Sequence, residues 1–117
     1  MGAGESMAGA RRKPNLFVER GEDMPSMLVR HHVQDYAKWR PGYDAHAAVR
    51  LAAGCTGTQV FRDSKDPNEI VLLLKWDNLA NARTFAQSQD LRETMQRLGV
   101  DGQPDISYLD DAGQTAT

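Results

Sequence analysis

The chain has 117 residues, of which 40% are hydrophobic and 26% charged, a length and composition typical of one globular domain. Its formal net charge is -2 with acids and bases interspersed, whereas nucleic-acid-binding proteins carry a clustered basic surface. The single cysteine, Cys55, excludes an internal disulfide and a cysteine-rich zinc site. The longest apolar run, residues 70–74, is far shorter than the roughly 20 residues of a membrane helix. We therefore expect a cytoplasmic protein that binds neither nucleic acid nor membrane.

The two ends of the chain differ in composition from the part between them. Residues 1–25 contain several glycines, two prolines and many charges without periodicity, which predicts a disordered N-terminal extension. Because the regular pattern begins just after Met24, a second interpretation is that translation starts at Met24. Residues 26–110 carry the pattern of one folded domain, and residues 111–117 form a polar tail that we expect to be flexible.

The domain begins with a predicted strand followed by a helix. Residues 27–33 alternate roughly between apolar and polar side chains, as a strand does. Asp35 is a residue type that caps the start of a helix, and Gly54 is one that follows its end. Pro41 removes one backbone donor from this helix, which predicts a kink after Arg40.

Two further strands are expected next, over residues 56–62 and 69–76. Residues 70–74 within the later strand are all apolar, so both of its faces should be covered. A second helix is expected to begin at Asn78, to turn Phe85 inward, to restart at Ser88 and to end at Gly99. Residues 103–109 are the expected last strand.

The order β-α-β-β-α-β predicts an α+β, ferredoxin-like fold. Such a fold has a four-stranded antiparallel sheet with the helices on one face only. The other face of the sheet would then be bare, although the strand over residues 69–76 is apolar on both sides. We expect that a second copy covers this face, giving a homodimer through the open side of the sheet.

Several short stretches between residues 28 and 109 carry a family resemblance. These stretches are residues 33–39, 53–54, 60–62, 66–68, 76–77 and 98–100, followed by 108–109. On them the chain resembles the dimeric α+β barrel superfamily, and in particular its small bacterial proteins of the antibiotic biosynthesis monooxygenase-like and cyclase-like groups. The resemblance implies a dimeric α+β barrel with a ligand cavity between the sheet and the helices of each subunit.

The same resemblance implies a cofactor-independent monooxygenase or a cyclase acting on a small aromatic or polyketide-like molecule. Haem-degrading members of the superfamily need a histidine on the second helix, and residues 79–98 contain none. We therefore expect no cofactor. The alternative function is a non-catalytic small-molecule-binding or stress-response dimer.

The first strand holds three candidate polar residues. His31 and His32 are adjacent and point to opposite faces, so they cannot bind one metal ion together, and no metal site is predicted. Arg30 and His32 share a face, where an arginine could stabilise an anion and a neutral histidine could accept a phenolic proton. The alternative is a solvated, ion-paired face. Val29 and Val33 share the face of His31 instead, which leaves open which face meets the cavity.

Trp39, Tyr43 and His46 follow one another on one face of the first helix. Aromatic residues at this spacing usually belong to the core, but with His46 beside them they could hold a flat aromatic ligand. Trp76 lies at the end of a strand, in a region where some oxygenases of the superfamily carry a tryptophan. The predicted catalytic residues are Arg30, His32 and His46, and the predicted ligand-binding residues are Trp39, Tyr43, Trp76 and Phe85.

Overall fold

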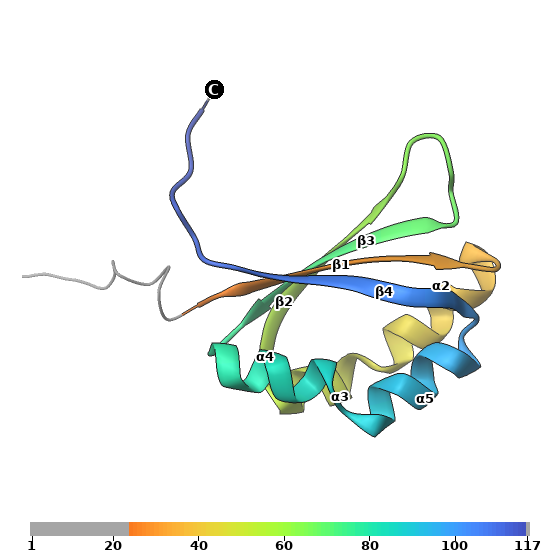
Figure 1. Cartoon of the computed structure of the whole chain (residues 1–117), viewed down its shortest axis with the longest axis horizontal. Coiled ribbons are helices and arrows are strands. Elements are labelled where there is room, and N and C mark those ends of the chain that lie inside the picture. The colour runs from red at the N-terminus through yellow and green to blue at the C-terminus, as the bar shows by residue number, and fades with distance from the viewer. Residues whose placement is uncertain (1–23, 117) are drawn as a thin grey trace, which may run out of the picture.

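The computed structural model of the protein describes residues 24–116 (Figure 1). The expected disorder of the N-terminal extension and the alternative start at Met24 stay predictions, because residues 1–23 lie outside the described residues. Residues 110–116 follow the last strand without regular secondary structure. Within the described part of the chain, no helix is long and apolar enough to cross a membrane.

Four strands and four helices make up the domain, and they confirm the expected α+β order. In chain order the elements are β1 (Ser26–Val33), α2 (Tyr36–Ala45), α3 (Ala47–Ala53), β2 (Cys55–Arg62), β3 (Glu69–Trp76), α4 (Leu79–Ala86), α5 (Gln89–Arg97) and β4 (Val100–Leu109). The strands form one sheet in the order β2-β3-β1-β4, with every neighbouring pair antiparallel. All the helices lie on the same face of this sheet (Figure 1).

The sheet separates a buried face under the helices from an open face. In β3, Ile70, Leu72 and Leu74 are buried, with exposed fractions of 0%, 6% and 2%, and they belong to the core. Val71 and Leu73 alternate with them and are only half-buried, because they point to the opposite face of the strand. The helices cover one face of this strand, and the cover expected on its other face stays a prediction.

The structure divides the first predicted helix into two, α2 and α3. Asp35 caps α2 as expected, since its Oδ1 accepts a hydrogen bond from the Ala37 amide at 2.9 Å. Pro41 does not end α2, which runs on to Ala45, and the helix is divided from α3 at His46, which the sequence did not predict. The kink expected after Arg40 stays a prediction. Buried Trp39 and Tyr43 lie on either side of the proline, and their packing holds the helix together despite the missing donor.

The end of the α2–α3 segment is as predicted. Gly54 has a φ of 113°, in the left-handed region that favours glycine, and its amide donates to the Arg50 and Leu51 carbonyl groups. A Cβ added to Gly54 would lie 2.5 Å from Asp77 Oδ1. The close approach of these two residues ties the end of α3 to the loop after β3.

The second helical segment breaks where the sequence predicts. Asn78 caps α4 through the Asn81 amide at 2.8 Å, and Ser88 caps α5 through the Leu91 amide at 3.1 Å. The last strand begins at Val100 instead of residue 103, which corrects the predicted boundary. Its first residues pair with the end of β1 beyond a register shift between Arg30 and His32, so the extra residues are held by tertiary pairing.

Candidate functional site

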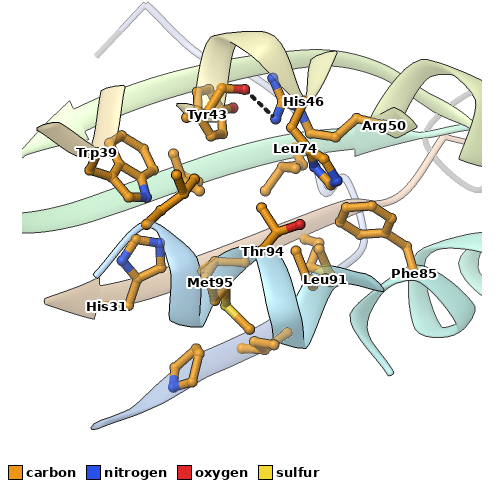
Figure 2. A pocket seen from close by; sticks show the side chains of 16 residues that line it. His31, Trp39, Tyr43, His46, Arg50, Leu74, Phe85, Leu91, Thr94 and Met95 are labelled. Carbon is orange, nitrogen blue, oxygen red and sulfur yellow. Dashed lines mark hydrogen bonds between the residues drawn. The ribbon is translucent and has the colours of Figure 1, made fainter. Parts of the chain in front are cut away.

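A pocket of about 60 Å³ lies between the helices and the covered face of the sheet (Figure 2). Side chains from β1, β3, β4 and all the helices line it. The apolar lining residues are Met27, Val29, Trp39, Leu72, Leu74, Phe85, Leu91, Met95, Leu98, Pro104 and Ile106. The polar ones are His31, Tyr43, His46, Arg50 and Thr94. A largely apolar wall with a few polar groups is typical of a small-molecule site.

His31 is the polar group that β1 contributes to the pocket. The alternation of β1 turns Val29, His31 and Val33 towards the helices, and His31 is 5% exposed. Its ring meets the Trp39 ring edge to face, with 5.7 Å between centroids. Burial lowers the pKa of His31, so its imidazole is neutral near pH 7. Its Nδ1 is buried and has no hydrogen-bond partner among residues 24–116.

Trp39 and Tyr43 form an aromatic wall on α2. Their rings are stacked, with 4.8 Å between centroids and 24° between planes. The Tyr43 hydroxyl group is buried, and no described residue is its hydrogen-bond partner. The structure places both predicted ligand-binding residues at the pocket, and their role there stays a prediction.

Arg50 lines the pocket, and its guanidinium group lies over the Tyr43 ring (Figure 2). Its guanidinium carbon is 3.8 Å from the ring centroid, and its Nη1 donates to the Tyr43 carbonyl oxygen at 2.9 Å. The sequence prediction did not include Arg50 in the site. A charged residue on the apolar stripe of a helix, one turn beyond His46, was the signal that could have identified it.

His46 borders the pocket at the turn between α2 and α3. Its Nε2 lies 2.9 Å from Asp90 Oδ2, and its side chain is 11% exposed. Asp90 belongs to the first turn of α5, so this pair connects the two helical segments across the pocket. The His46 ring also lies near Phe85, with 6.2 Å between centroids.

Phe85 and Trp76 have different positions relative to the pocket. Phe85 lines it, as predicted. Trp76 is completely buried and is not a lining residue; its ring contacts Phe85 with 5.3 Å between centroids. Phe85, and not Trp76, reaches this pocket, and the role of both residues in ligand binding stays a prediction.

Arg30 and His32 lie on the open face of the sheet, away from the pocket. Arg30 Nη1 is 3.2 Å from Glu69 Oε2, and His32 Nδ1 is 3.0 Å from Asp101 Oδ2. The hydrogen bond to Asp101 raises the pKa of His32. The predicted grouping of these two residues with His46 does not occur within one chain. The two buried valines of β1 turn His31, and not His32, towards the helices.

Comparison with known families assigns the fold. The family model described as antibiotic biosynthesis monooxygenase matches residues 37–97, which are 61 of the 117 residues. The chain belongs to the antibiotic biosynthesis monooxygenase family. This match confirms the resemblance seen in the sequence. No protein of curated function matches the chain significantly.

Several solved structures have the same fold as this chain at low sequence identity. A Bordetella bronchiseptica protein assigned to the antibiotic biosynthesis monooxygenases is 21% identical, with a TM-score of 0.67, over 77% of this chain and 98% of its own. SnoaB from Streptomyces nogalater, a cofactor-independent oxygenase, is 16% identical, with a TM-score of 0.63, over 80% of this chain and 97% of its own. A conserved protein from Methanosarcina mazei is 13% identical, with a TM-score of 0.64, over 79% of this chain and 96% of its own. These similarities show the fold alone.

Within this family fold, the pocket contains no evident metal site. Among residues 24–116, no three histidine, cysteine or acidic side chains are grouped so that they could hold a metal ion. The polar side chains that line the pocket include a neutral imidazole, a phenol and a guanidinium group, set in apolar surroundings.

The two adjacent histidines should titrate on opposite sides of the ordinary value of 6.5. Burial disfavours the charged form of His31, whereas Asp101 favours the charged form of His32. As pH falls through 6.5, His31 should therefore reduce the stability of the fold, because the unfolded chain takes up its proton first. Two-dimensional NMR of the imidazole protons, assigned with His31→Gln and His32→Gln, measures both values. Equal pKa values at the two positions would contradict this description of the site.

Proposed function

We propose that the chain is a cofactor-independent monooxygenase that acts on a small phenolic molecule held in the pocket. The observation that carries the proposal is His31, a neutral imidazole with a buried, unpartnered Nδ1 in an aromatic pocket. With its proton on Nε2, this nitrogen is an acceptor and can act as a general base. Membership of the family and the fold shared with an oxygenase support the proposal.

In the proposed reaction, His31 takes the phenolic proton of the substrate. The electron-rich phenolate then transfers one electron to molecular oxygen, and the two radicals combine to form a carbon–oxygen bond. His31 returns its proton to the peroxide anion that results. The hydroperoxide then loses water, formed from its terminal hydroxyl group and the ring hydrogen on the same carbon, to give a quinone. One oxygen atom of O₂ therefore enters the product and the other leaves as water. The burial that keeps His31 neutral also disfavours a lone imidazolium, and the phenolate formed beside it supplies the compensating negative charge.

The aromatic wall and the apolar lining suit a flat ring in this reaction. Trp39 and Tyr43 present stacked rings, against which a substrate ring can pack. The apolar residues around them exclude water from the anion, which strengthens its interaction with nearby charged and polar groups. The aromatic residues therefore have a positioning role in the proposal.

The size of the pocket favours a substrate with a single ring. Its volume of about 60 Å³ is smaller than the roughly 150 Å³ of an engineered apolar cavity that binds benzene. Leu91 and Met95, on α5, and Leu98 at its end are half-buried and form part of the wall. Rotamer changes in these side chains, methionine in particular, would enlarge the pocket for a ring.

Replacing His31 by glutamine should reduce turnover by about 10²- to 10⁴-fold, the usual contribution of a general base. His32→Gln is the matched control, because this neighbour lies on the open face and should leave turnover unchanged. The assay is oxygen uptake with a panel of single-ring phenols and hydroquinones, with products identified by mass spectrometry. Unchanged turnover in His31→Gln would contradict the proposed base. A ligand that binds to the wild-type chain without any product would favour the non-catalytic alternative.

We also propose that the protein is a homodimer formed through the open face of its sheet. Val71 and Leu73 lie on this face of β3 beside exposed Phe61 of β2, which pairs with Val71. Such apolar side chains on an otherwise uncovered sheet are typical of a subunit interface.

Sedimentation equilibrium should give a mass of twice 13.0 kDa for the full chain. Leu73→Asp places a charge on the open face and should yield a folded monomer. Leu51→Asp is the control, because Leu51 is 70% exposed on α3, away from the sheet, and this variant should stay dimeric. A monomeric wild-type chain would contradict the proposed interface.

A further inference from the structure

Arg50 places a buried positive charge in the wall of the pocket. The residue is 7% exposed although it lies on a short helix at the edge of the domain. A guanidinium group stays protonated in proteins, so burial does not neutralise it. Buried charges are normally paired, because an unpaired charge away from water is strongly destabilising.

The contacts of Arg50 satisfy only part of the hydrogen-bonding capacity of its guanidinium group. Nη1 donates one hydrogen bond to the Tyr43 carbonyl oxygen, and the guanidinium plane lies over the Tyr43 ring (Figure 2). Among residues 24–116, no carboxylate forms an ion pair with Arg50. The remaining N–H donors have the geometry to bind a planar anion.

Neighbouring residues do not supply the missing negative charge. Cys55 is close enough to feel the charge of Arg50, but burial raises the pKa of its thiol and keeps it neutral. The carboxylate of Asp90 pairs with His46, with 2.9 Å between Oδ2 and Nε2. The guanidinium group of Arg50 can therefore pair with an anionic group of a ligand in the pocket.

We propose that Arg50 binds the carboxylate of the ligand, so that the pocket takes a small aromatic acid. This inference rests on the proposed function and narrows its substrate class. Figure 2 shows His31 beside Trp39, and Arg50 reaching from α3 back to Tyr43, where its guanidinium group lies. A ligand that spans the pocket would direct its phenolic hydroxyl group towards His31 and its carboxylate towards Arg50. A hydroxybenzoic acid with these groups on opposite sides of the ring has this arrangement.

Isothermal titration calorimetry on the wild-type full chain tests this inference with two probes, 4-hydroxybenzoate and the neutral 4-hydroxybenzamide. The acid should bind about ten- to a hundredfold more tightly than the amide, since a charge-assisted pair adds to the same ring contacts. This comparison needs no variant, so a folding defect cannot obscure it. Equal affinities for the two probes, or no binding of either, would overturn the inference.

Three variants locate the charge that gives the preference. Arg50→Met should abolish the preference for the acid, and Arg50→Lys should retain part of it. Arg62→Met is the matched control, because Arg62 also stacks on a tyrosine, at 3.9 Å from the Tyr36 centroid, but does not line the pocket. Equal losses in Arg50→Met and Arg62→Met would overturn the inference. Oxygen uptake on neutral phenols that depends on His31, without any preference for acids, would overturn it and leave the proposed function standing.

Discussion

The two-residue period of β1 is the constraint on which the site depends. Each residue of this central strand faces either the helices or the open side of the sheet. Met27, Val29 and Val33 occupy the helix side and are at most 7% exposed. They hold His31 in the same buried layer, where no described residue forms a hydrogen bond with its Nδ1. A slip of one residue in this register would exchange the environments of the two histidines.

The helices turn this buried strand face into a pocket. The α2–α3 segment supplies most of the polar groups, because its inner stripe carries Tyr43, His46 and Arg50. The α4–α5 segment supplies apolar side chains together with Thr94. The pair between His46 and Asp90 joins the two segments at the edge of the pocket. The proposed base His31 therefore comes from a strand, β1, whereas the buried guanidinium group of Arg50 comes from a helix, α3.

Local chemistry made much of the fold predictable from the sequence. Side chains that cap helices act on amides two or three residues away, so Asp35, Asn78 and Ser88 could be identified without any tertiary information. The alternation and apolar content of the strands predicted the β-α-β-β-α-β order along the chain, and the family resemblance implied the same architecture. The bend at His46 and the early start of β4 at Val100 depend on packing and pairing between distant segments, which the sequence does not display.

The candidate site was harder to predict than the fold. Trp39, Tyr43, His46 and Phe85 were found because a helix repeats its inner face at regular spacing. Polar character drew attention to Arg30 and His32, whereas the neighbouring valines already indicated that His31 faces the core. His31 and His32 are chemically identical side chains, and their environments differ because they lie on opposite faces of β1. A buried polar residue on an apolar face is therefore a better guide to the site than a cluster of polar residues.

A crystal structure of the full chain soaked with 4-hydroxybenzoate tests the central claim most directly, namely that the pocket is the functional site and His31 its base. The account predicts ligand density between the helices and the sheet, with the phenolic oxygen about 2.6–3.2 Å from His31 Nδ1, the range in which a general base acts. Ligand density on the open face beside Arg30 and His32 would contradict it. So would an empty pocket in which His31 Nδ1 is hydrogen-bonded to the protein itself.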